Sequence, residues 1–204
     1  MDEKNHMSVS GRELEEEITA FLNGMANRPG GKRTKPGCNV IHGKGCALAT
    51  CVDNEPRVTP IDFFNEGTTI WIAGQPGGKI ANIMRNPKVS VGIFEPVDHS
   101  IEQKSLQIWG TAELINIKNK PEEFKQRMEA LGVSEAASGV IEELVQMGVI
   151  PAERQEKTLE MGLKQFNLIK ITPVKMVLLH MRPGKLPLKK TWENGKATVK
   201  AAGV

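Results

Sequence analysis

The stretch that decides the fold runs from Arg57 to Phe94 and reads RVTPIDFFNEGTTIWIAGQPGGKIANIMRNPKVSVGIF. Its apolar runs are interrupted by Asn65-Glu66-Gly67 and Pro76-Gly77-Gly78, which are turn signals. The pattern predicts two strands, a glycine-rich corner, a short helix and a further strand. Arg57 opens the stretch, and Lys79 comes directly after Gly77-Gly78. The backbone N–H groups of these glycines and the positive N-terminal end of the following helix could also bind an anion. These features predict a site for an anionic group, with a phosphate as the first candidate.

The flanking sequence extends this pattern into a mainly antiparallel sheet. ALATCV, from Ala47 to Val52, precedes the stretch and is expected to form a short strand. SLQIWGTAELINI, from Ser105, predicts a longer strand with a bulge or close backbone approach at Gly110. Residues 167–171 and 174–181 predict two more strands joined at Thr172-Pro173. Six or seven strands linked by tight turns favour a small barrel over an open parallel sheet.

Helices are expected around this barrel. Ser10 and Glu13 have capping-box spacing before an amphipathic helix over about 11–23. Pro121 suits a helix first turn, and a further helix is expected over about 138–147. Residues 151–162 are compatible with either a helical turn or a loop. We expect a single domain made of an N-terminal helix and loop extension (1–45), a barrel with inserted helices (46–181) and an irregular basic tail (182–204).

Composition narrows the function classes. The chain has 204 residues, a net charge of +3, 39% hydrophobic residues and three cysteines. The weak net charge and the lack of aromatic residues among the basic ones argue against nucleic-acid binding. The odd cysteine count, the polar N-terminus and the short apolar runs predict a soluble, cytoplasmic protein without a membrane span.

The ordered motifs carry a family resemblance. The run LATCVDNEPRVTPIDFFNEGTTIWIAGQPGGKIANIMRNPKVSVGIF, followed by LQIWGTAEL, resembles the pyridoxamine 5′-phosphate oxidase-like, FMN-binding split-barrel family. The resemblance covers roughly residues 46–117 and resumes at FNLIKITPVKMVLLH; its most specific element is Lys79 to Val89. It implies a mainly β fold with peripheral helices (α+β), namely a six-stranded antiparallel split β-barrel. It also implies a homodimer with FMN at the interface.

The resemblance also implies a set of cofactor-binding residues. Arg57 and Lys79 would meet the FMN phosphate, and a run on the same strand would line the ribityl chain and the ring: Val58, Thr59, Pro60, Ile61 and Asp62. The next strand and corner would add Ile72, Ala73 and Gly78. Ser105 or Gln107 would come from a neighbouring strand, and Trp192 matches a tryptophan that reaches the partner chain's flavin.

Three departures from the family pattern bear on activity. Gly78 stands where the true oxidases have an arginine, and Asp62 stands where they have a lysine. The arginine–histidine pair that should follow Trp192 to hold a pyridoxal substrate is missing. We therefore expect an FMN-dependent oxidoreductase acting on a small molecule, with NAD(P)H as a candidate electron donor, rather than a true pyridoxamine phosphate oxidase. The alternative is a non-catalytic protein of the same fold that binds flavin, the deazaflavin F420 or haem; no catalytic residue is assigned.

Four cysteine and histidine residues form a second group: Cys38, His42, Cys46 and Cys51. Their spacing matches no common zinc module, so no metal site is expected. Cys46 and Cys51 should point to opposite faces of one strand. The long loop over 24–45 could cap the flavin pocket. The cysteines in and beside this loop would then have a role near the flavin. His180 is expected to be a packed histidine, with haem ligation as the rival interpretation.

Overall fold

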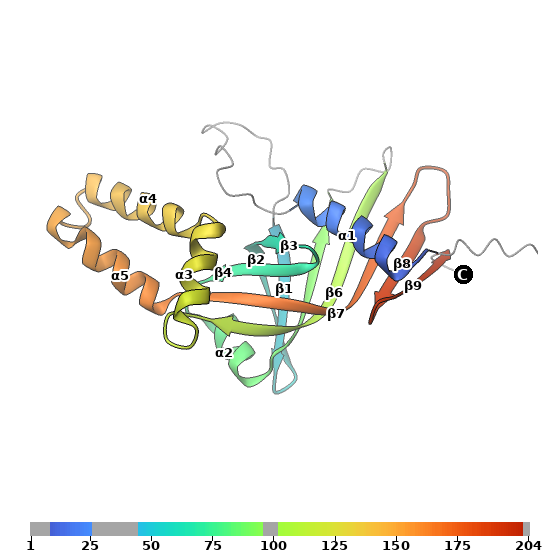
Figure 1. The fold of residues 1–204 in the computed structure, drawn as a ribbon, viewed down its shortest axis with the longest axis horizontal. Coiled ribbons are helices and arrows are strands. Elements are labelled where there is room, and N and C mark those ends of the chain that lie inside the picture. Colours follow the sequence, from blue (N-terminus) through green and yellow to red (C-terminus); the bar gives the residue numbers. More distant parts are fainter. Residues whose placement is uncertain (1–8, 26–44, 96–101, 202–204) are drawn as a thin grey trace, which may run out of the picture.

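The computed structural model describes residues 9–25, 45–95 and 102–201, and within them an antiparallel sheet of nine strands with helices at its periphery (Figure 1). The strands are β1 (Gly45–Val52), β2 (Glu55–Asp62), β3 (Phe64–Glu66), β4 (Thr69–Gly74), β5 (Lys88–Phe94), β6 (Gln103–Ile115), β7 (Asn167–Met181), β8 (Leu188–Glu193) and β9 (Lys196–Ala201). The helices are α1 (Gly11–Met25), α2 (Gly78–Arg85), α3 (Pro121–Ala130), α4 (Val133–Gln146), the short 3₁₀ turn η1 (Ala152–Arg154) and α5 (Gln155–Gln165).

Strand β7 connects the two parts of the sheet. The strand order is β2-β1-β5-β6-β7-β4-β3, and the β8–β9 hairpin pairs with β7 as well. The first half of β7 pairs with β4 and its second half with β8, while β6 pairs along most of its length. This curved sheet confirms the split-barrel prediction, with nine strands in the described residues rather than six.

The prediction of two strands joined at Thr172-Pro173 is wrong, because β7 is continuous over 15 residues. The register with β6 shifts between Trp109 and Gly110, opposite this proline. Proline lacks the N–H that a regular ladder needs, and a bulge accommodates it. A Cβ on Gly110 would lie 2.7 Å from the Thr172 carbonyl oxygen, so the close backbone approach predicted at Gly110 is confirmed.

The prediction of an irregular C-terminal tail is also wrong for most of that segment. Residues 188–193 and 196–201 form the antiparallel β8–β9 hairpin. Its turn is Asn194-Gly195, with φ of 49° and 77°. Positive φ at both central residues is what a type I′ hairpin turn requires, and Asn-Gly is its preferred sequence.

Helix α1 packs on the sheet near β8 and β9 (Figure 1). The predicted capping box is confirmed: the Ser10 N–H donates to Glu13 Oε2 (2.8 Å), and the Glu13 N–H donates to Ser10 Oγ (3.2 Å). One face of the helix is buried, and this face joins the apolar side of the sheet in the main core cluster. The N-terminal extension thus includes a helix that contributes to the core.

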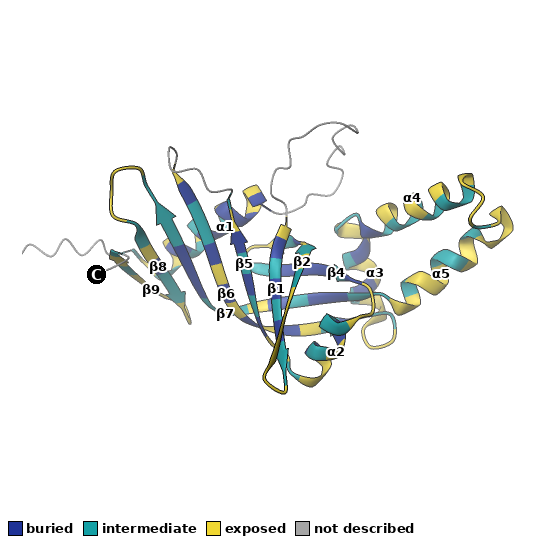
Figure 2. Ribbon diagram, turned by 180° about the vertical axis from the view of Figure 1, so that it is seen from behind, coloured by how far each residue is buried: buried dark blue, intermediate teal, exposed yellow. Residues whose placement is uncertain are grey.

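The segment between β6 and β7 forms a helical insertion, α3 to α5, that projects from one end of the sheet (Figure 1). Residues 151–162, left open by the sequence, form η1 and most of α5. Helix α3 and the start of α4 contribute Phe124, Met128 and Val133 to a second core cluster around Trp71. Beyond Val133, α4 and α5 contain no buried residue (Figure 2). Among the described residues, no helix has the length and apolar character needed to cross a membrane.

Candidate functional site

The site predicted from the sequence lies where the sheet is split. Within the described residues, β2 pairs only with β1. Strand β3 pairs with β4 from Glu66↔Thr69 to Phe64↔Trp71, so Ile72 to Gly74 pair only with β7. The side of β4 that faces away from β7 is therefore unpaired at these residues, close to β2. Backbone groups at such an edge are available to a ligand.

The corner after β4 presents the start of α2. Gly77 is the N-cap residue, and its carbonyl accepts the first helical hydrogen bonds from the N–H groups of Ile80 (3.0 Å) and Ala81 (3.1 Å). The N–H groups of Gly78 and Lys79 come before these bonds and have no intrahelical acceptor. They point out of the helix start, where the helix dipole favours negative charge.

Arg57 lies against this corner. A Cβ built on Gly78 would be 2.9 Å from Nη1 and 3.0 Å from Cζ of Arg57. The absent side chain of Gly78 thus leaves the space that the guanidinium needs. Neither Arg57 nor Lys79 has an ion pair with any residue in the described ranges. Two cations without partners therefore gather at a helix N-terminus.

Two asparagines of the Lys79–Val89 element hold α2 in place. Asn82 donates to the Thr50 hydroxyl of β1 (3.0 Å), and Asn86 donates to the Cys51 carbonyl (2.8 Å). These bonds fix α2, whose first turn contains Lys79, against β1. The sequence pattern did not separate these anchoring residues from the ligand-facing ones.

The remaining predicted residues of β2 alternate between two environments. Val58, 61% exposed, and Pro60 share the outer side of the strand with Asp62. Thr59 is half-buried, and its Oγ1 is shielded from solvent without a hydrogen-bond partner in the described part of the chain. Ile61 is half-buried and packs against the main core cluster.

Two further predicted residues, Ile72 and Ala73, lie on β4. Ile72 is fully buried in the core, so it can reach a ligand only through its backbone. Ala73 is half-buried and packs against the second core cluster.

Ser105 and Gln107 share one face of β6, because Leu106 between them is buried on the other face. They pair with Phe94 and Gly92 of β5, so β1 and β5 separate them from β2 within one chain. Trp192 lies farther away in β8, where it pairs with Met176 and packs against the core. A single chain therefore brings together the residues of β2, β4 and α2 but not these three.

The cysteine group lies partly outside the described residues, which include neither Cys38 nor His42 nor the loop over 26–44. Cys46 is buried, and Cys51, on the opposite face of β1, is half-buried. Burial, reinforced by the nearby Asp62 carboxylate, raises the pKa of the Cys46 thiol to about 12. This thiol therefore stays protonated at neutral pH and is a poor nucleophile. Among the described residues no group of three or more potential ligands could hold a metal ion.

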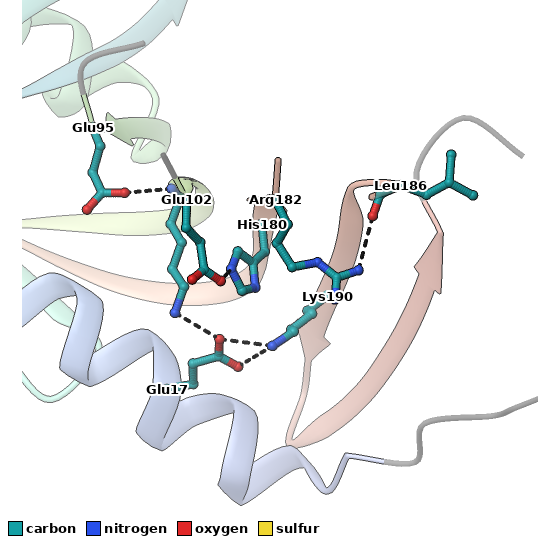
Figure 3. Close-up of polar contacts among 8 residues, drawn as sticks. Glu17, Glu95, Glu102, His180, Arg182, Leu186 and Lys190 are labelled. Atoms are coloured by element: carbon teal, nitrogen blue, oxygen red, sulfur yellow. Dashed lines mark hydrogen bonds and ion pairs between the residues drawn. The ribbon is translucent and has the colours of Figure 1, made fainter. Parts of the chain in front are cut away.

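His180 belongs to a cluster at the α1 end of β7 (Figure 3). Its Nε2 contacts the Glu102 carboxylate. Its Nδ1 is buried and has no partner among the described residues. Neither ring nitrogen faces an open site, so the geometry gives no support to the haem-ligand interpretation.

Comparison with known proteins identifies the family. Residues 42–177, more than half of the chain, match the family model described as pyridoxamine 5′-phosphate oxidase. The chain belongs to this family. An uncharacterised protein of Rhizobium meliloti (strain 1021) is 38% identical over 56 residues, which are 28% of this chain and 37% of that protein. The chain thus spans just over a third of the length of this curated relative.

Solved structures share the fold at low identity. A pyridoxamine 5′-phosphate oxidase-related, FMN-binding protein of Nostoc punctiforme PCC 73102 has a TM-score of 0.58 at 14% identity, covering 81% of this chain and 90% of that one. An FAD-binding protein of Mesorhizobium loti has a TM-score of 0.50 at 20% identity, with 81% and 94% covered. Campylobacter jejuni ChuZ has a TM-score of 0.52 at 20% identity, covering 96% of this chain and 64% of that one.

The residues at the split fit a flavin phosphate and its chain. Arg57, Lys79 and the N–H groups at the start of α2 provide positive charge and donors for a dianion. The shielded Thr59 hydroxyl without a partner could bond to a polar chain lying along β2. The unpaired edge of β4 offers further backbone groups. The donor set at the split is therefore compatible with FMN.

Proposed function

We propose that this protein is an FMN-binding flavoprotein that acts as an oxidoreductase on a small molecule. The observation that carries the proposal is the contact of the Arg57 guanidinium with Gly78 beside Lys79 at the start of α2. Two cations without ion pairs in the described residues, together with free N–H groups, form a site suited to a terminal phosphate. The family assignment makes FMN the first candidate to carry this phosphate.

Each group at the split would have a distinct task. Arg57 and Lys79 would neutralise the phosphate, and charge-assisted bonds of this kind are the strong ones in proteins. Thr59 would donate to or accept from the ribityl hydroxyls, and Pro60 to Asp62 would lie beside the ring. Asn82 and Asn86 would act indirectly by holding α2 in position.

A second copy of the chain would complete the site. Ser105 and Gln107 lie on the outer face of β6, away from β2 of their own chain. This face also exposes apolar side chains, since Trp109 is 40% and Phe94 63% exposed. Exposed apolar residues on a sheet face favour burial against another protein surface. We therefore propose a homodimer in which β6 of one chain faces the split of the other.

The bound flavin would supply the redox chemistry, and NAD(P)H is the proposed electron donor. The protein would bind and orient the cofactor and exclude water from it. No described side chain is assigned a proton-transfer role, and the high pKa of the Cys46 thiol argues against nucleophilic chemistry at this cysteine. The missing arginine–histidine pair after Trp192 makes a substrate other than pyridoxamine phosphate the expected one.

The decisive experiment is cofactor identification. We expect the purified protein to be yellow, to release FMN on denaturation as identified by mass spectrometry, and to rebind FMN at one per chain. A folded protein that takes up no FMN contradicts the proposal. Release of F420 or haem instead would support the corresponding alternative, and FMN binding without NAD(P)H-driven reduction would favour a flavin carrier. Light scattering that shows a monomer at micromolar concentration would contradict the dimer.

A further inference from the structure

The helical insertion contains a cavity that the flavin site does not use. It has a volume of about 490 Å³ and lies between α4 and α5, and Met128 and Phe166 are among the residues that line it. This volume is within the range of small-molecule pockets, which are mostly apolar with a few polar groups. Gln75 and Pro76, from the loop before α2, also contribute to its wall.

The lining of this cavity is neutral. The described residues that line it are mostly apolar, the polar ones are Gln75, Thr158 and Gln165, and none of them is charged. A neighbouring cavity of about 740 Å³ on α3 to α5 differs in this respect, because its lining includes Lys125, Glu129 and Glu160. The neutral cavity is thus suited to an uncharged ligand, since it has no group to compensate a buried charge.

The packing of the two helices explains why the space is open. An amphipathic helix normally buries its apolar stripe. On α4 only Val133 is buried, and α5 has no buried residue. Small residues face each other across the gap, including Ala137 of α4 and Gly162 of α5, and a Cβ built on Gly162 would meet nothing within 4 Å. The apolar stripes of α4 and α5 are therefore only partly covered by each other.

We propose that this cavity is a binding site for a small, neutral, mainly apolar molecule of one or two rings. The apolar walls would take the rings, and the amides of Gln75 and Gln165 would take one hydrogen-bonding group at the edge. Thr158 already donates to the Arg154 carbonyl (2.8 Å), so its hydroxyl would serve as an acceptor. The cavity shares no lining residue with the anion site at the split, although Gln75 and Pro76 directly precede the Gly77-Gly78 corner of that site.

The test uses two glycine substitutions and a neutral two-ring probe. Gly162→Leu fills the cavity, whereas Gly139→Leu is a matched control on α4. Both glycines are exposed and helical, and at both a built Cβ meets nothing within 4 Å, but Gly139 does not line the cavity. Binding of N-phenyl-1-naphthylamine is followed by its fluorescence, with circular dichroism and light scattering on all three proteins.

We expect saturable binding of one probe per chain to the wild type and to Gly139→Leu, and a loss of affinity of at least roughly tenfold in Gly162→Leu. Both variants should keep the helix content and oligomeric state of the wild type. No saturable binding to the wild type, or equal binding by the two variants, would overturn the proposal. So would a changed oligomeric state of Gly162→Leu alone, because it would show that a second chain occupies this surface.

Discussion

Two cationic side chains lie at the corner between β2 and α2, and two lie at the contact between α1 and β8. The two places differ in whether a carboxylate pairs with the cations. At the first, Arg57 and Lys79 have no ion pair in the described residues. At the second, Glu17 of α1 lies between Lys190 at 2.7 Å and Lys104 at 3.2 Å (Figure 3). Lys190 is 9% exposed, and Glu17 and Lys104 are half-buried, so this second group is only partly accessible to solvent.

This difference separates charges that stabilise the fold from charges available to a ligand. A buried ammonium is costly unless a carboxylate compensates it, so Lys190 requires Glu17. Arg57 and Lys79 are more accessible and keep their hydration without a protein partner. We therefore expect substitutions at the α1–β8 contact to change stability and substitutions at the β2–α2 corner to change ligand affinity.

The largest expected effect is the loss of stability on Glu17→Ala. This change leaves Lys190 and Lys104 facing each other without a counter-charge, and should lower the free energy of unfolding by about 2–3 kcal/mol. Glu16→Ala is the control on the same helix, because its pair with Arg12 is exposed and should be worth less than about 0.5 kcal/mol. Urea denaturation measures both. Equal losses in the two variants would show that the burial of the Glu17 group has no energetic consequence.

The next effect is the loss of FMN affinity in Lys79→Ala. Deleting a charge-assisted phosphate contact costs about 1.5–3 kcal/mol, or roughly ten- to a hundredfold in Kd. Lys88→Ala is the control, since this lysine is exposed at the start of β5, outside α2, and has no ion pair in the described residues. Fluorescence titration gives the affinities, and unfolding should be unchanged in both. An unaltered Kd in Lys79→Ala would remove this residue from the site.

Local signals in the sequence predicted much of the fold. The capping box of α1 and the glycine corner before α2 each depend on a few adjacent residues, and both are present in the structure. The Asn194-Gly195 turn is equally local and could have been recognised as a hairpin signal. The continuity of β7 could not be recognised in this way, because it depends on the shifted register of its pairing with β6, which is distant in sequence.

The sequence singled out residues of β2, β4 and α2 that the structure brings together at the split, but it did not predict their geometry. The sequence predicted that Arg57 and Lys79 bind one anion and that Gly78 lies in the site in place of an arginine, but it did not predict any contact between Gly78 and Arg57. The structure shows that this glycine leaves room for the guanidinium of Arg57, a contact across 21 positions of sequence that depends on the packing of α2 on β1. The cofactor roles of all the predicted residues stay predictions, and those of Ser105, Gln107 and Trp192 depend in addition on a second chain.

A smaller effect is expected from Gly78→Ala. The added Cβ would lie 2.9 Å from Nη1 of Arg57, so the guanidinium must move, which its flexible side chain allows. We expect FMN affinity to fall by about 1 kcal/mol, or roughly fivefold, without loss of stability. Gly77→Ala is the control, because its added Cβ meets nothing within 4 Å and its φ of 160° is close to extended. If the two variants bind FMN equally, the contact between Arg57 and the corner is not required.

The smallest expected effect is the pH dependence of the α1–β8 contact. Burial raises the pKa of the Glu17 carboxyl, but the hydrogen bonds and charges of Lys190 and Lys104 outweigh it, and the pKa is lowered from the ordinary value of 4.5. A carboxyl with a lowered folded-state pKa stabilises the fold above its unfolded pKa, and this contribution is lost as the pH falls through the folded value. Glu17→Gln lacks the titrating group, so its stability deficit against wild type should be full at pH 7 and should narrow progressively below pH 4.5. Urea denaturation of both proteins across this range measures the deficit, and a deficit that stays constant with pH would show that Glu17 is not held as a carboxylate by its two lysines.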